Sequence, residues 1–257
     1  MVNILEKSYL LHNLDFHILQ IFFRIMKQKY LFAFLVILAM AVNVMGIYNE
    51  DFLLSRSGEF FFVLPLIAYY YKELPIGNLN FYTFLLCIIT ANALAFFRDS
   101  WYFNYIILGL WLASYIFLVR EAIKHTAYEK GSRFMALYFV LVVAIYTYLL
   151  SLHMMELERS LSDGFEFSFY IVYYLNILIL AVTALVYYLN SFSRKSVFFM
   201  CLTISFIFAD VFRDMEVFYF ADLSVEIVGS LIRFAGLKLT FLFFVTREKK
   251  LRLLNLV

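Results

Sequence analysis

Eight long apolar runs recur along this chain of 257 residues, and they constrain its fold more than any other feature. Roughly 20 mostly apolar residues in a helix cross a hydrocarbon core of about 30 Å. Apolar residues make up 65% of the chain and charged residues 16%, whereas soluble domains average about 45–50% and about 25%. We therefore predict an all-α, polytopic transmembrane bundle. Its expected spans are residues 30–48, 60–71, 81–97, 101–119, 134–155, 165–189, 197–212 and 223–245.

The segments outside these runs divide the chain into three parts. Residues 1–29 form an N-terminal arm in which Leu14, Ile18 and Phe22 alternate with basic side chains. This pattern is typical of an amphipathic helix lying on a membrane surface. Residues 30–246 form the bundle, and residues 247–257 form a basic tail. No cleavable signal peptide is expected, because the first run starts near residue 30 without a small-residue cleavage site.

The Lys and Arg residues indicate the orientation of the bundle. With eight spans, fifteen of them fall in segments on the side of the two termini and four on the opposite side. Cytoplasmic segments are enriched in Lys and Arg, so both termini are predicted to be cytoplasmic. We expect a multi-pass protein of a bacterial inner membrane.

The two halves of the chain resemble one another. The triplet at 97–99 (FRD) ends the third expected span as that at 212–214 ends the seventh, and Cys87 corresponds to Cys201. Spans four apart run in the same direction, so the pattern predicts a parallel repeat of four spans plus four. Repeat-built membrane proteins place their sites between the repeats. The alternative is a chance match in a chain with 32 Phe.

Acidic residues within apolar spans are the main functional candidates, because a charge is costly there. Asp99, Asp210, Asp214 and Glu226 all fall towards the outer side of the expected bundle. Asp210 lies just inside the apolar region, where burial favours a protonated carboxyl unless a cation is close. Alternatively, Asp99 and Asp214 are solvated helix ends, each paired with the adjacent arginine.

Two cations in the last span, Arg233 and Lys238, allow two interpretations. They pair with acids of a neighbouring helix, or bind a phosphate, for which arginine offers a planar fork of donors, or do both. The tyrosine pair at 173–174 is most simply an interface anchor. No phosphate-binding Gly-rich loop and no metal-binding or nucleophile motif is present, so we expect neither a cofactor nor a metal, and nothing indicates nucleic acid.

Five short stretches resemble the YhhN family of eight-span membrane proteins, which includes lysoplasmalogenase. They are LPL at 64–66, RD at 98–99, GLWLASY at 109–115, FIFAD at 206–210 and RFAG at 233–236. The chain departs from the family pattern at several positions. Leu64 replaces a lysine, Arg98 a glycine, Ala209 a serine and Tyr115 a histidine, and Leu237 beside Lys238 replaces a polar residue.

The resemblance implies a hydrolase that cleaves the vinyl ether of a lysophospholipid to a fatty aldehyde and a glycerophospho-base. It implies Asp99 and Asp210 as the catalytic pair, as in other two-carboxyl mechanisms. Expected burial alone suggests Asp210 as the acid and Asp99 as the base. Substrate-binding candidates are Arg233, Lys238, Tyr115 and Asp214. The expected partner is a membrane lipid. The alternatives are a small-solute or lipid transporter, the membrane part of a sensory system, and an inactive member of the same fold.

Overall fold

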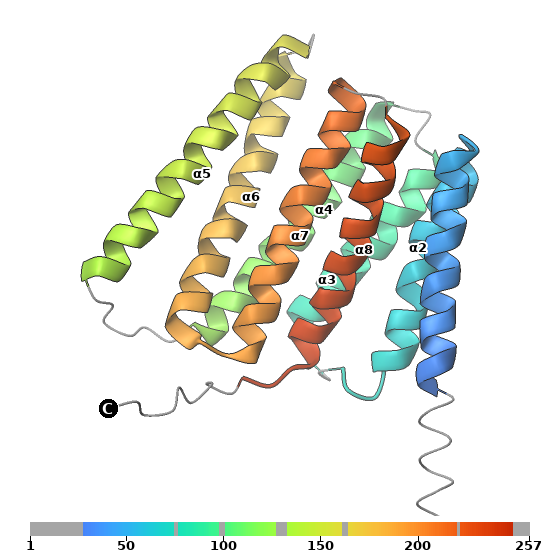
Figure 1. Cartoon of the computed structure of the whole chain (residues 1–257), viewed down its shortest axis with the longest axis horizontal. Coiled ribbons are helices and arrows are strands. Elements are labelled where there is room, and N and C mark those ends of the chain that lie inside the picture. Colours follow the sequence, from blue (N-terminus) through green and yellow to red (C-terminus); the bar gives the residue numbers. More distant parts are fainter. Residues whose placement is uncertain are drawn as a thin grey trace, which may run out of the picture.

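The computed structural model describes residues 28–74, 77–97, 101–126, 133–160, 164–219 and 222–248. They form eight helices long and apolar enough to cross a membrane, which confirms the predicted helical bundle (Figure 1). After a first helix, Gln28–Tyr48, come α2 (Phe52–Tyr70), α3 (Leu79–Leu94, extended by the short η1, Ala95–Phe97), α4 (Trp101–His125), α5 (Arg133–Ser160), α6 (Gly164–Ser191), α7 (Arg194–Phe218) and α8 (Leu223–Val245). The chain is thus an integral, multi-pass membrane protein.

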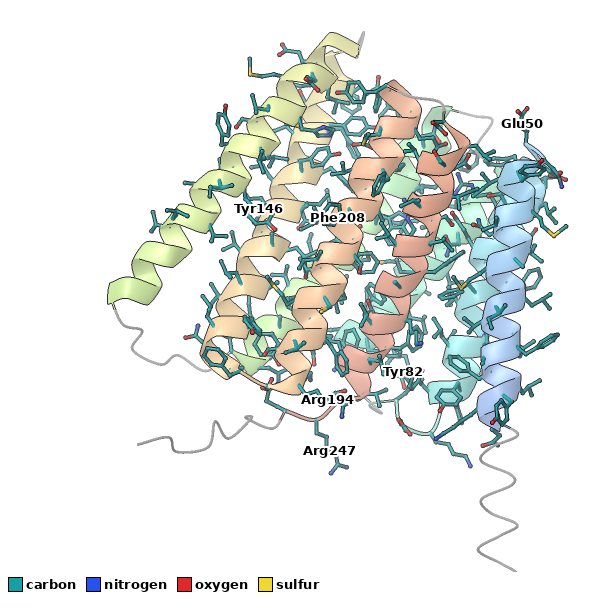
Figure 2. All side chains as sticks on the ribbon, in the orientation of Figure 1. Glu50, Tyr82, Tyr146, Arg194, Phe208 and Arg247 are labelled. Carbon is teal, nitrogen blue, oxygen red and sulfur yellow. The ribbon has the colours of Figure 1, made fainter. Side chains whose placement is uncertain are left out.

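Successive helices run in opposite directions, so Gln28 and Val245 lie at the same end of the bundle. In Figure 1, α7 and α8 lie in front of α3 and α4, and α5 lies at the side of the bundle against α6. Figure 2 shows Arg194 and Arg247 at one end and Glu50 at the other. We call these the inner and outer ends, because basic residues mark the cytoplasmic side.

The second span begins well before its expected start. α2 starts at Phe52, where the Asp51 side chain accepts a hydrogen bond from the Leu54 backbone N–H at 3.1 Å. The prediction of a start near residue 60 was wrong, because polar residues in the first turns lower the hydropathy of that segment. Ser55 and Glu59 are nevertheless buried, since they face other helices and not lipid.

The seventh span also extends beyond its expected bounds at both ends. A capping box formed by Ser193 and Ser196 starts α7 at Arg194, and the helix continues to Phe218. The expected end at residue 212 was wrong because Asp214 is fully buried and does not mark a solvated helix end. α4 likewise continues past residue 119 to His125.

Close backbone packing holds the first helix against α2. A Cβ atom at Gly46 would lie 2.2 Å from the Ser55 nitrogen, and one at Gly58 would lie 2.5 Å from the Asn43 nitrogen. The side chain of Asn43 donates to the Ser55 carbonyl at 3.0 Å and accepts from Ser230 of α8 at 2.5 Å. Small residues with an interhelical polar contact are a common means of joining membrane helices.

Large apolar side chains fill much of the middle of the bundle, beside a few buried hydroxyls such as Thr203 and Thr240. They include fully or almost fully buried residues of α4, α7 and α8: Leu118, Phe199, Leu202, Phe206 and Phe241. Towards the inner end, Asn78 and Asn80 donate to Glu121 at 2.8 and 2.7 Å. The buried Lys195 lies 2.9 Å from His125, so this inner cluster joins α3, α4 and α7.

The internal repeat remains a prediction, with support from one helix pair. α3 follows the cap Asn78, and α7 follows the cap Ser193. Asn78 and Ser193 are as far apart in the sequence as the two FRD triplets, so the starts of α3 and α7 correspond in the same register. Arg98 and Asp99 lie outside the described residues, as do most of the N-terminal arm and of the basic tail.

Candidate functional site

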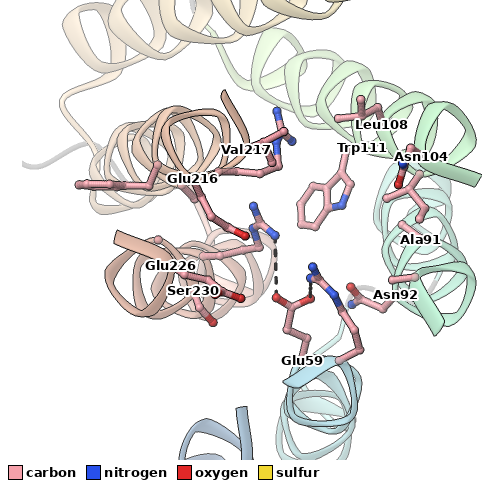
Figure 3. Close-up of a pocket in the computed structure, with 18 of the residues that line it drawn as sticks. Glu59, Ala91, Asn92, Asn104, Leu108, Trp111, Glu216, Val217, Glu226 and Ser230 are labelled. Atoms are coloured by element: carbon pink, nitrogen blue, oxygen red, sulfur yellow. Dashed lines mark hydrogen bonds and ion pairs between the residues drawn. The ribbon is translucent and has the colours of Figure 1, made fainter. Parts of the chain in front are cut away.

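A cavity of about 370 Å³ lies at the outer end of the bundle. It is surrounded by the starts of α2, α4, α6 and α8 and by the ends of α3 and α7. Its walls carry Leu108 and Trp111 beside four glutamates and three arginines, so they are both apolar and strongly charged (Figure 3). A concave site with a few convergent polar groups is the usual place for a small ligand.

Glu59 joins two of the arginines across the cavity. Its Oε2 lies 2.9 Å from Nη1 of Arg56, one turn earlier in α2, and its Oε1 lies 3.9 Å from Nη1 of Arg233 in α8 (Figure 3). The Nε of Arg56 is buried without a hydrogen-bond acceptor among the described residues. The Arg233 guanidinium also lies over the Trp111 ring, 5.5 Å from its centroid. This arrangement forms a two-arginine site around a single carboxylate.

Three further glutamates line the same cavity: Glu166 from α6, Glu216 from α7 and Glu226 from α8. Glu216 and Glu226 are close enough to Arg56 to interact with its charge. The cavity therefore combines anion-binding guanidinium groups with carboxyl groups able to exchange protons.

The third cavity arginine, Arg213, is held from behind by two buried aspartates of α7. Its Nη1 lies 3.1 Å from Asp210 Oδ1, and its Nη2 lies 2.9 Å from Asp214 Oδ1. The Tyr173 ring of α6 lies 5.2 Å from the guanidinium carbon. Hydrogen-bonded pairing of this kind stabilises charges that burial alone would disfavour.

Asp210 lies behind the cavity wall and accepts a hydrogen bond from each of its three partners. The hydroxyls of Tyr115 and Tyr173 both donate to its Oδ2 at 2.8 Å, and Arg213 donates to its Oδ1. Asp210 is therefore paired with one cation and two hydroxyl donors. In this arrangement Asp210 positions Arg213; its role as the catalytic acid stays a prediction.

The polar network continues from Asp214 to α5. Tyr174 donates to Asp214 Oδ2, and the Tyr174 hydroxyl lies 2.9 Å from Nε2 of His153. The interpretation of Tyr173 and Tyr174 as interface anchors was wrong, because both rings are buried. Each hydroxyl instead donates to one of the two aspartates.

The structure brings some of the predicted site residues together and separates others. Arg233 lines the cavity, and Tyr115 contacts Asp210, one layer behind the wall. Asp214 is buried behind the wall as well. Lys238 is exposed on the outside of the bundle, because five residues along a helix turn it about 140° away from Arg233. Asp99 lies outside the described residues.

Sequence reasoning missed Arg56 and Glu59 as site residues. Residues three apart on a helix lie on the same face, so their spacing is compatible with an ion pair. The predicted second span, however, begins only at residue 60, after both of them. Trp111 was noted only as part of a motif. Nothing in the local sequence could show that it lies beside Arg233, which is far away in the chain.

Metal ligands do not gather in the described part of the chain, where no three His, Cys, Asp or Glu side chains are placed to hold an ion. The chain matches no family model, no curated protein and no solved structure. The site is therefore defined by its own geometry: a charged outer cavity, backed by a buried network of aspartates and tyrosines.

Proposed function

We propose that this chain is a bacterial inner-membrane hydrolase that cleaves the vinyl ether of a lysophospholipid in the outer cavity. The observation that carries the proposal is the cavity itself, in which paired arginines, several carboxyl groups and apolar walls meet inside a membrane bundle. The products would be a fatty aldehyde and a glycerophospho-base. The resemblance to the YhhN family points to the same chemistry.

The arginines supply the means to hold a phosphate. Guanidinium groups bind phosphate oxygens with paired, charge-assisted hydrogen bonds. Arg56 and Arg233 approach the same point from α2 and α8, so a phosphate there would contact both. The apolar wall at Leu108 and Trp111 would lie against the lipid part of the ligand.

The carboxyl groups supply the means for acid–base chemistry. Cleavage requires protonation of the alkene carbon that does not carry the ether oxygen. This step converts the vinyl ether into an oxocarbenium ion. Water then adds to this ion and loses a proton, and the hemiacetal breaks its C–O bond to give the aldehyde and the glycerol hydroxyl. A protonated carboxyl can donate, and an ionised one can stabilise the cation. Glu216 and Glu226 face the cavity and are the candidates for these two roles, while Asp210 acts through Arg213.

A transporter is less well supported by the fold. The charged cavity lies at the outer end of the bundle, and large buried side chains such as Leu202 and Phe206 lie further along α7. A site at one end suits an enzyme that receives its substrate from one leaflet.

Aldehyde release from a lysoplasmenyl lipid by the detergent-purified protein tests the proposal. Wild type is compared with Glu216→Gln, Glu226→Gln, Asp210→Asn and Asp99→Asn, the last because the resemblance implies it. An ester-linked lysolipid serves as the specificity control. Asp222→Asn, at the exposed start of α8, is the matched carboxylate variant.

We expect release from the vinyl ether alone, strongly reduced in at least one cavity-glutamate variant and in Asp210→Asn, and unchanged in Asp222→Asn. No release by wild type, under conditions in which an active lysoplasmalogenase releases aldehyde, would rule out this reaction. The inactive-member alternative would then hold if the protein still binds the lipid.

A further inference from the structure

We propose that Glu59 is a built-in competitor for the anionic ligand of the cavity, occupying the two-arginine site until a phosphate displaces it. The inference rests on the phosphate site of the proposed function and does not depend on hydrolysis. Its ligand class is a phosphate monoester or diester. The group is named by its chemistry, since a lipid headgroup and a free phosphate share it.

The geometry shows one carboxylate serving two cations. The Glu59–Arg56 contact is short at 2.9 Å, whereas the Glu59–Arg233 contact is long at 3.9 Å. The buried Arg56 Nε has no acceptor among the described residues. The described donors of this pair are therefore only partly used, and a phosphate with more oxygens could use them better.

The charges explain why the competitor is needed in the unliganded protein. The side chains of Arg56, Arg233 and Glu59 are 17%, 15% and 11% exposed. Two guanidinium groups this deeply buried would repel one another and lose hydration without an anion between them. Glu59, which contacts both arginines, supplies this negative charge most directly, and Glu216 and Glu226 add to it at Arg56. A ligand must therefore exchange places with Glu59 or share the two arginines with it.

This exchange sets the affinity of the site. Removal of the Glu59 charge leaves both arginines to the ligand and also removes a negative charge that repels phosphate. Glu59→Gln should thus bind phosphate more tightly, on the order of tenfold. The same substitution at Glu216, which lines the same cavity from α7, should have a smaller effect.

Trp111 provides a direct readout. It is one of two tryptophans in the chain, and Arg233 lies over its ring, so a ligand that moves Arg233 changes the fluorescence. In a Trp101→Phe background, the detergent-purified full chain is titrated with inorganic phosphate, glycerol 3-phosphate and a lysophospholipid. If the lysophospholipid binds more tightly than inorganic phosphate, the phosphate that the site recognises belongs to a lipid headgroup. If the affinities are equal, the site recognises free phosphate. Competition by Glu59 is expected in both cases.

A charge-balanced double variant separates competition from loss of fold. Phosphate binding by the variants that lack Arg233 is measured by isothermal titration calorimetry, because their Trp111 fluorescence no longer reports on that side chain. Arg233→Gln should weaken phosphate binding, and Glu59→Gln combined with Arg233→Gln should remove most of the gain of Glu59→Gln. If Glu59→Gln alone does not fold, the comparison of Arg233→Gln with this double variant gives the same difference. Elution volume and melting temperature confirm that the variants compared are folded.

The proposal is overturned if folded Glu59→Gln binds phosphate no more tightly than Glu216→Gln, or if wild type shows no saturable phosphate response. Failure of aldehyde release, with the Glu59 effect intact, would remove the hydrolase proposal alone. Aldehyde release without a Glu59 effect would remove this inference alone.

Discussion

Arg213 and Asp214 are neighbours in sequence, yet they form an ion pair inside the bundle, with Nη2 2.9 Å from Oδ1. Successive residues on a helix point about 100° apart, so the long arginine side chain must turn back towards its neighbour. It can do so because Asp210 and the Tyr173 ring hold the other side of the guanidinium. The cavity wall thus owes its fixed cation to residues that do not themselves line the cavity.

Loss of Asp214 should therefore destabilise the whole protein. Asp214→Ala leaves the Tyr174 hydroxyl without its buried acceptor and Arg213 with Asp210 as its remaining paired carboxylate; each buried group left unsatisfied typically costs about 1–3 kcal/mol. The melting temperature of the detergent-purified protein measures the effect. Asp222→Ala, an exposed helix cap, is the control and should shift it far less; equal shifts would contradict a buried structural role for Asp214.

Close packing of the first helix against α2 gives a second prediction. Gly46→Ala places a Cβ 2.2 Å from the Ser55 nitrogen, so the helices must separate. Overpacking of this kind costs about 1–3 kcal/mol or more. Gly109→Ala is the control within α4, because an added Cβ there meets nothing within 4 Å, and it should be neutral or stabilising by up to about 1 kcal/mol. The melting temperatures of the two variants, compared with that of wild type, test this prediction.

The sequence predicts the spans well because the hydrophobic requirement of the bilayer is local and continuous. It predicts α2 poorly, because hydropathy does not distinguish a polar residue that faces lipid from one that faces a cavity. Arg56 and Glu59 lower the local hydropathy, and yet they lie inside the bundle. Only the position of α8 beside α2 shows why the helix can begin at Phe52.

The site shows the same division between local and distant information. The cost of a buried carboxylate identifies Asp210 from the sequence alone. Its partners Tyr115 and Tyr173 lie 95 and 37 residues away, so its acceptor role depends on helix packing. Lys238 illustrates the opposite error, since a charge within a span need not face the interior.

Cysteine labelling tests the inferred orientation. In a chain with Cys87 and Cys201 replaced by alanine, Asn49→Cys and Asp222→Cys lie at the outer end, and Lys72→Cys and Arg247→Cys at the inner end. All four positions are exposed. An impermeant maleimide added to intact cells should label only the outer pair, and should label the inner pair after permeabilisation. The reverse pattern would invert the orientation taken from the basic residues.

The two cations of α8 should differ sharply when each is made apolar. Lys238 faces outward, so Lys238→Leu removes a charge from the surface of a membrane span, where a central cation costs about 2.5–3.5 kcal/mol on insertion scales. We expect unchanged phosphate binding and an equal or higher melting temperature.

Arg233→Leu instead takes one of the two cations away from Glu59 and the cation from the Trp111 ring. It should weaken phosphate binding by at least about tenfold, since charge-assisted hydrogen bonds are the strong ones. Isothermal titration calorimetry with inorganic phosphate and the melting temperature, measured on both variants, test the pair. A binding loss in Lys238→Leu as large as that in Arg233→Leu would place Lys238 in the site and contradict the separation of these two side chains.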